Sequence, residues 1–236
     1  MNNMIKSPFK QPWHFDKFRE DKEGEYSKCF GHFVGDWTED IITAREMGDM
    51  PQTDNNFLGD FDSPQLAKQR KAYENNQMKD IVLYNNADGI DYFNMLPVFE
   101  NMISTLQLNR EQKLGCRFND LYPNDQLMWH IDKYKGKGEL NKSTLDDPNF
   151  KYKPSDRIRF LIMLEDWEPG QILQFGNRTY TQWRAGMVMC WEWSTLPHCV
   201  LNGSWKQRPA LQITGVMTDK TIEIIKEGNS ETIYNV

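Results

Sequence analysis

The sequence predicts a mainly β protein, an antiparallel sandwich or barrel with helices covering one of its sheets. From about residue 113 onward, short segments rich in β-branched and aromatic residues follow one another closely. Turn residues separate these segments and no helices alternate with them, which argues against a parallel sheet. The segments with a helical pattern come earlier in the chain, where they can cover one sheet of the β region.

The first part of the chain is expected to support this β region. The first sixty residues show no sustained period, so we expect loops and short strands there. Ser63 and Pro64 then form a typical helix start before "QLAKQRKAYENNQM". A second helix is expected in "PVFENMISTLQL", residues 97–108, packed on a sheet through one apolar stripe. That stripe consists of Val98, Phe99, Met102, Ile103 and Leu106.

The β region contains a series of strand candidates and one long interruption. The candidates are "LGCRFNDLY", "QLMWHID", "RIRFLIML", "QILQF", "RTYTQW", "MVMCWEW", "HCVL" and "PALQITGVM". The clearest turn signals between them are Pro169-Gly170, Gly176-Asn177, Ala185-Gly186 and Asn202-Gly203. The interruption is the polar stretch 133–156. A connection of this length inside a β domain is typically disordered or a functional lid.

The length and charge of the chain limit its organisation and its partners. With 236 residues we expect a single domain, residues 1–236. Residues 1–112 would form an N-terminal extension with supporting helices, 113–218 the β core, and 219–236 a C-terminal strand or tail. A net charge of -6 provides no field that attracts a phosphate backbone, which argues against a nucleic-acid partner.

Targeting signals and cysteines predict the compartment. The start of the chain lacks a signal-peptide pattern, and no long apolar run is present, so we predict a soluble protein without membrane contact. The four cysteines form no CxxC pair and are too few for a disulfide framework. Reduced thiols in the cytoplasm are therefore expected.

Two histidine-x-aspartate pairs are candidate metal sites. His130 and Asp132 lie in a predicted strand, where residues two apart point to the same face and can share a metal. His14 and Asp16 form the competing pair. A third potential ligand favours the pair His130 and Asp132. His198 follows His130 by 68 residues, which leaves room for the intervening strands. Each histidine alone is more often a structural residue, and the prediction rests on the combined set.

A single arginine suggests an anionic ligand. Arg208 follows His198 by ten residues and begins an apolar strand. A guanidinium that faces the inside of a β-barrel is costly unless an anion meets it. A carboxylate brought by a ligand would supply charge-assisted hydrogen bonds worth about 1.5 to 3 kcal/mol each. Arg208 therefore predicts an anionic cosubstrate.

This combination resembles the Fe(II)- and 2-oxoglutarate-dependent dioxygenases. The segments "YPNDQLMWHID", "RIRFLIMLEDWEPGQILQF" and "WRAGMVMCWEWSTLPHCV" look most like the prolyl-hydroxylase-like branch of that superfamily. The similarity covers roughly residues 113–218. It implies a double-stranded β-helix, that is, a jelly-roll or cupin-like fold with helices packed on one sheet.

The resemblance also implies a role for each candidate residue. His130, Asp132 and His198 match the catalytic set that binds Fe(II), and Arg208 matches the residue that holds the distal carboxylate of 2-oxoglutarate. Tyr122 stands eight residues before His130, where related enzymes place a tyrosine that can touch the cosubstrate. With O2 as the third reactant, the implied reaction is oxidative decarboxylation of 2-oxoglutarate to succinate coupled to C–H hydroxylation.

Three positions narrow the implied chemistry. Asp132 is retained, whereas related halogenases lack this carboxylate, so hydroxylation is favoured. Thr214 stands where the nucleic-acid dealkylases typically carry a second arginine, which argues against that branch. Ala210 departs from branches that have a serine or threonine there, so that hydroxyl is missing from this position.

The substrate and the activity have stated alternatives. The branch suggests a peptide or protein substrate, modified at a proline or another amino-acid residue, and a free small metabolite is the alternative. A non-catalytic metal-binding jelly-roll module is a rival from another class. A zinc hydrolase would use the same three ligands but leaves Arg208 unexplained.

Trp129, Trp191 and Trp193 are expected to fill the core.

Overall fold

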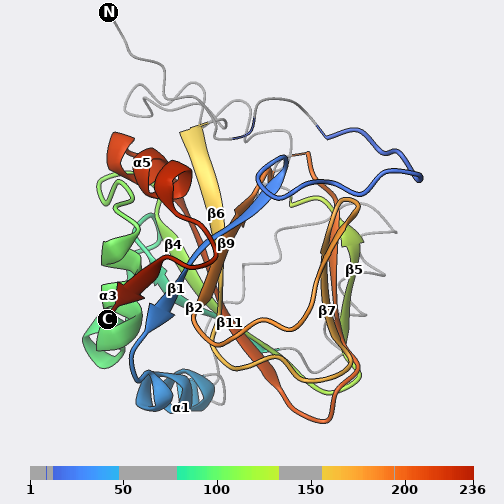
Figure 1. The fold of residues 1–236 in the computed structure, drawn as a ribbon. Helices are drawn as coiled ribbons and strands as arrows, with labels where there is room; N and C mark the ends of the chain where they lie inside the picture. The colour runs from blue at the N-terminus through green and yellow to red at the C-terminus, as the bar shows by residue number, and fades with distance from the viewer. Residues whose placement is uncertain (1–8, 10–12, 48–78, 133–155, 194) are drawn as a thin grey trace, which may run out of the picture.

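The computed structural model describes residues 9, 13–47, 79–132, 156–193 and 195–236. These residues form two β-sheets and three α-helices, α1 (Thr38–Met47), α3 (Pro97–Thr105) and α5 (Asp219–Glu227). The helices lie on one side of the larger sheet, and the smaller sheet lies on its other side (Figure 1). The predicted mainly β class, with helices packed on one sheet, is confirmed.

The two sheets have eight and four strands. The larger contains, in order, β12 (Ile233–Asn235), β1 (Ser27–Val34), β9 (Met187–Trp191), β6 (Arg157–Met163), β11 (Arg208–Val216), β4 (Gly115–Leu121), β2 (Lys79–Asn85) and β3 (Ile90–Asp91). The smaller contains β5 (Gln126–His130), β10 (His198–Asn202), β7 (Gln171–Phe175) and β8 (Arg178–Tyr180). Neighbouring strands are antiparallel except β1 and β12, which are parallel.

The strands from β4 to β11 form the jelly roll. Their order is β4-β11-β6-β9 in the larger sheet and β5-β10-β7-β8 in the smaller one. The chain therefore crosses between sheets repeatedly, and every one of these strands except β8 pairs with a strand far away in the sequence, as in a double-stranded β-helix. Each of the eight predicted strand segments coincides with one of these strands to within a few residues.

The prediction for the first sixty residues was wrong in part. The strand β1 has eight residues and pairs with β9 inside the larger sheet, and residues 38–47 form the helix α1. A polar residue on the buried side conceals this helix in the sequence. Asp40 is buried, and its carboxylate accepts a 2.8 Å hydrogen bond from the backbone N–H of Phe99 in the first turn of α3. The apolar stripe of α1 is interrupted as a result.

Two further predictions concern segments that the described residues do not include. The helix expected after Pro64 falls within residues 48–78. The polar connection 133–156 lies outside the described part of the chain except for its last residue, Asp156.

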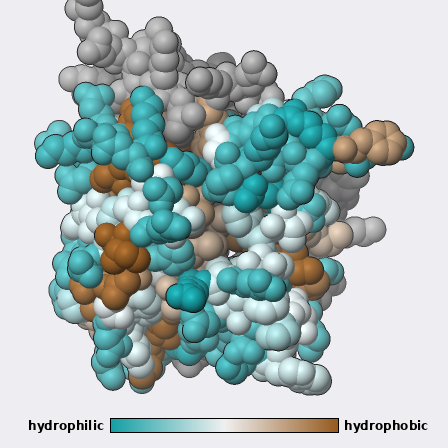
Figure 2. Space-filling view, viewed as in Figure 1, coloured by the Kyte–Doolittle hydropathy of each residue, from teal (hydrophilic) through white to brown (hydrophobic). Residues whose placement is uncertain are grey.

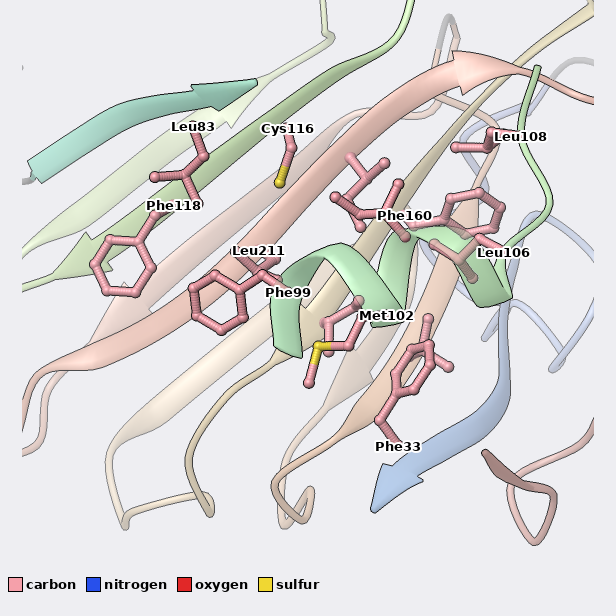
Figure 3. Close-up of a cluster of buried hydrophobic side chains, with 14 of the residues drawn as sticks. Phe33, Leu83, Phe99, Met102, Leu106, Leu108, Cys116, Phe118, Phe160 and Leu211 are labelled. Carbon is pink, nitrogen blue, oxygen red and sulfur yellow. The ribbon is translucent and has the colours of Figure 1, made fainter. Parts of the chain in front are cut away.

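The helix α3 covers the outer face of the larger sheet, as its apolar stripe predicted. It begins at Pro97, and Phe99, Met102 and Ile103 on it are buried. Figure 3 shows this helix lying across the strands, with Phe99 and Met102 among the sheet side chains Phe118, Phe160 and Leu211. We call this apolar core between the helices and the larger sheet, to which Phe99, Met102, Phe118, Phe160 and Leu211 belong, the outer cluster.

The C-terminal segment adds a helix that the sequence reading did not include. Residues 219–236, expected as a strand or tail, contain α5 before the strand β12. Thr218 caps α5 by accepting a hydrogen bond from the backbone N–H of Thr221. Ile222 and Ile225 then add α5 to the outer cluster.

A second apolar cluster, here called the inner cluster, lies between the two sheets. On β6 the residues Ile158, Phe160 and Ile162 belong to the outer cluster, whereas Leu161 and Met163 belong to the inner one. Residues that alternate along a strand point to opposite faces, so β6 contributes side chains to both clusters. The functional candidates lie on the inner side.

The surface shown in Figure 2 is mostly hydrophilic, and hydrophobic residues gather there in a few separate areas. Within the described ranges, no helix has the length and apolar character needed to cross a membrane.

Candidate metal centre

Three sequence-predicted ligands meet at one end of the small sheet. His130 is the last residue of β5 and His198 the first residue of β10, and the two are paired across the antiparallel ladder. Their ring centroids are 4.2 Å apart. Asp132 follows β5 by two residues and joins them, so that one ligand atom from each of the three residues lies within 4.8 Å of the other two.

Backbone carbonyl groups orient both imidazole rings. The Nδ1 of His130 is 2.6 Å from the carbonyl oxygen of Met128, and the Nδ1 of His198 is 3.3 Å from that of Leu196. When Nδ1–H donates to these carbonyls, the lone pair of each ring is on Nε2. The two Nε2 atoms lie 3.8 and 3.5 Å from the carboxylate oxygens of Asp132.

Burial keeps the imidazole of His198 neutral. Its pKa is lowered to about 4 by burial, against the opposing charge of Asp132. At neutral pH its Nε2 can therefore bind a metal without first losing a proton. The Oδ2 of Asp132 is also buried and has no hydrogen-bond partner among the described residues. Because buried carboxylate oxygens are normally satisfied, this atom suggests a missing ligand such as a cation.

The donor set fits a divalent transition metal. Two imidazole nitrogens and one carboxylate oxygen suit Fe(II) in non-haem oxygenases, and they also suit Zn(II). Within the described part of the chain, no other cluster of three or more potential metal ligands is found. The competing pair, His14 and Asp16, is exposed and does not take part in this cluster.

Arg208 is buried on the inner side of the larger sheet. It pairs in register with Leu121 on β4, and its Nη1 lies 3.7 Å from the sulfur of Met163; both neighbours belong to the inner cluster. Burial lowers the pKa of Arg208 to about 10, with the charge of Asp120 acting in the opposite direction. Its Nε has no hydrogen-bond partner among the described residues, and no carboxylate there forms an ion pair with it.

Tyr122 lies directly after β4, in the turn that leads to β5. It is half-buried, and its carbonyl oxygen accepts a 3.1 Å hydrogen bond from the backbone N–H of Asp125. Its neighbour Leu121 is the register partner of Arg208, which places Tyr122 close to that strand end. The expected contact of its hydroxyl with a cosubstrate stays a prediction.

One residue beside the metal ligands was missed. Arg159 on β6 places its Nη1 2.5 Å from the Oδ1 of Asp132, and its guanidinium lies 5.8 Å from the ring centre of Trp193. A signal was present in "RIRFLIML", because Arg159 alternates with apolar residues that face the outer cluster. Arg159 also pairs in register with Thr214 on β11. Thr214 stands where the nucleic-acid dealkylases typically carry a second arginine, so in this chain the guanidinium belongs to the neighbouring strand instead.

The three tryptophans expected in the core behave differently. Trp191 and Trp193 are buried, and the ring of Trp191 lies 5.4 Å from that of His198. The prediction for Trp129 was wrong: it is 49% exposed, because β5 is an edge strand of the small sheet and Trp129 is not on its inner side. Together with Trp13, Phe15 and Pro197 it lines a surface cavity of about 320 Å³.

Comparisons with known proteins give structural likenesses only. No family model matches the chain, and no curated protein matches it. The cupin domain of an XRE-family transcriptional regulator from Enterobacter cloacae is 8% identical, with a TM-score of 0.34, over 60% of this chain and 98% of that one.

Two further solved structures are similarly distant. A cupin domain from Bordetella pertussis is 12% identical, with a TM-score of 0.29, over 48% of this chain and 88% of its own. A prolyl-4-hydroxylase from Pseudomonas putida is 18% identical, with a TM-score of 0.31, over 53% of this chain and 61% of the enzyme. The jelly-roll assignment rests on the strand order itself.

Proposed function

We propose that this protein is an Fe(II)- and 2-oxoglutarate-dependent dioxygenase. It would couple the oxidative decarboxylation of 2-oxoglutarate to succinate with hydroxylation of a C–H bond. The His130, Asp132 and His198 cluster supports the metal part of this proposal, but it suits zinc enzymes and binding modules equally well.

The observation that carries the proposal is the buried guanidinium of Arg208. Among the described residues no carboxylate forms an ion pair with Arg208; a buried cation in that situation costs several kcal/mol, which a ligand carboxylate would offset. A metal-assisted hydrolase does not require such an anion, whereas a dicarboxylate cosubstrate does. The location of Arg208 on the inner cluster, which also contacts His198, favours a ligand that reaches from the metal to Arg208.

The protein's own groups have defined tasks in this proposal. His130, Asp132 and His198 would hold Fe(II), which when bound supplies the activation of O2 and of the keto acid. Arg208 would bind the distal carboxylate and set the orientation of the cosubstrate. The inner cluster, with Met163 against Arg208, would exclude water from this interaction and so strengthen it.

The substrate is proposed by class only. A peptidyl proline or another amino-acid residue of a peptide or protein fits the prolyl-hydroxylase-like sequence segments, and a free small metabolite is the alternative. Nucleic acid is disfavoured by the net charge of -6.

Anaerobic titration with Fe(II) and 2-oxoglutarate tests the proposal directly. We expect a visible absorption band that needs both components and is lost in His130→Ala. His14→Ala, which removes the histidine of the exposed competing pair, is the matched control and should keep the band. Metal binding without the band, and without succinate formation in air, would support the binding module instead. Zinc-dependent hydrolysis would support the third alternative.

A further inference from the structure

We propose that Arg159 is a positioning residue that occupies one oxygen of Asp132, so that this carboxylate presents only its other oxygen to the metal. The inference rests on the proposed function only in taking Asp132 as a metal ligand. Arg159 is not among the site residues that the sequence predicts.

The contacts of Asp132 divide its two oxygens. Oδ1 lies 2.5 Å from the Nη1 of Arg159, which is the distance of a strong charge-assisted hydrogen bond. Oδ2 lies 3.5 Å from the Nε2 of His198 and has no hydrogen-bond partner in the described ranges. Oδ2 therefore faces His198 without a competing hydrogen bond, whereas Oδ1, which lies 3.8 Å from the Nε2 of His130, already accepts a hydrogen bond from Arg159.

Arg159 is itself held firmly enough to act on Asp132. It lies on β6 between β9 and β11, in register with Trp191 and Thr214, in the middle of the larger sheet. Its guanidinium lies over Trp193, whose indole N–H donates a 3.1 Å hydrogen bond to the carbonyl of Arg157. The side chain is 15% exposed, so little solvent competes with Asp132 for its hydrogen bonds.

A carboxylate restricted to one oxygen leaves more of the metal available. A carboxylate that binds through both oxygens occupies two positions, and one of these would otherwise take cosubstrate or O2. Groups that hydrogen-bond to metal ligands also orient them, and their removal typically costs about 10- to 100-fold in metal affinity. Arg159 would act on both the affinity and the number of open positions.

Replacing Arg159 tests this role through metal binding alone. Arg159→Met keeps the apolar part of the side chain and removes the guanidinium group, and Arg159→Lys keeps the positive charge. We expect Co(II), titrated anaerobically into Arg159→Met, to bind roughly 10- to 100-fold more weakly than in the unaltered chain. Its d–d absorption should fall per bound ion, since Asp132 can then bind through both oxygens and raise the coordination number. Arg159→Lys should recover part of the affinity.

The matched control is Arg178→Met. Arg178 also pairs with a carboxylate, that of Glu23 at 2.8 Å, and lies over an aromatic ring, that of Tyr180 at 5.0 Å. This variant should bind Co(II) as the unaltered chain does, with the same spectrum. Circular dichroism of all metal-free variants separates failed folding from lost affinity, and Arg159→Lys supplies the reading if Arg159→Met does not fold.

The outcomes separate the two proposals. Equal Co(II) affinity and an unchanged spectrum in Arg159→Met, or in Arg159→Lys if only that variant folds, would overturn the role of Arg159 and leave the proposed function standing. Tighter binding in Arg159→Met would also overturn it, because Arg159 would then merely compete with the cation. Failure of the unaltered chain to bind any divalent metal would overturn both.

Discussion

The two faces of the larger sheet use the same strands for different purposes. Toward the helices, β6 contributes Ile158, Phe160 and Ile162 to a cluster made almost wholly of apolar side chains (Figure 3). Toward the small sheet, the same strand contributes Arg159 and Met163, beside the half-buried Asp132 and the buried Arg208. The helix side also buries polar groups, among them Asp120, which pairs with Arg45 of α1, but the buried Arg208 and the half-buried Arg159 face the small sheet.

This difference separates stability from chemistry along one strand. Apolar burial on the outer face stabilises the fold at about 25 cal/mol per Å². Buried charges on the inner face cost stability unless they are paired, so their presence there calls for another explanation, which ligand binding supplies. Substitutions on the outer face should therefore change unfolding, and those on the inner face should change ligand binding.

The largest expected effect comes from removing the metal-ligand carboxylate on the inner face. Asp132→Asn keeps the shape of the side chain and removes its charge, so we expect loss of metal-dependent succinate formation to the assay background. Asp16→Asn in the competing pair should have no such effect. Retained turnover in Asp132→Asn, measured as succinate per mole of protein, would break the comparison at its strongest point.

The next effect concerns stability on the outer face. Phe160 is fully buried and packs edge to face on Phe30, with ring centroids 5.5 Å apart. Phe160→Ala should lower the free energy of unfolding by about 3 to 5 kcal/mol in urea titrations. Metal affinity of the folded protein should stay unchanged. Phe18→Ala, at a ring that is 88% exposed, is the control and should stay within about 0.5 kcal/mol.

Arg208 should show the opposite signs for binding and stability. Arg208→Met removes charge-assisted hydrogen bonds worth about 1.5 to 3 kcal/mol, which weakens 2-oxoglutarate binding roughly 10- to 150-fold. The ligand-free protein should be as stable as before or more stable, because the variant removes a buried charge that has no ion pair among the described residues. Calorimetric binding and urea unfolding measure the two quantities. A loss of stability with unchanged cosubstrate binding would make Arg208 a structural residue.

The smallest effects sharpen the comparison at two adjacent residues. Ile162→Val on the outer face should cost about 0.5 to 1.5 kcal/mol of stability without changing the KM for 2-oxoglutarate. Met163→Leu on the inner face conserves volume and should cost under about 1.5 kcal/mol. Because it replaces the sulfur 3.7 Å from Arg208, it should change that KM by a few-fold. Identical KM values for both variants would contradict the idea that the inner face binds the cosubstrate and the outer face only stabilises the fold.

The strand pattern predicted an antiparallel sandwich or barrel because the strands are short, β-branched and separated by turn residues, and the family resemblance narrowed this to a jelly roll. The sequence pattern failed at α1, where the buried Asp40 breaks the apolar period in order to cap α3. A local pattern cannot reveal a hydrogen bond between residues 59 positions apart. The same limit hid the role of Arg159, whose partner Asp132 lies on the other side of a long connection.

The candidate site was predictable to the extent that its residues have few structural uses. An inward arginine on an apolar strand is costly, so Arg208 was a strong signal by itself, whereas His198 became one only in combination with His130, Asp132 and Arg208. Trp129 gave no such signal, since a tryptophan serves a core or a surface equally well, and only the edge position of β5 decides between them.

The pairing of His130 with His198 across β5 and β10 has a consequence for how the molecule assembles. These residues are 68 positions apart in the sequence and end up as direct neighbours in the small sheet. A cation bound by both histidines would link the two strands as a cross-link does. It would close the loop between them and so reduce the conformational entropy of partly unfolded states that keep the metal. Metal binding and the pairing of β5 with β10 would then be coupled. Without metal, the amide hydrogens of β5 should exchange with solvent before those of the other strands.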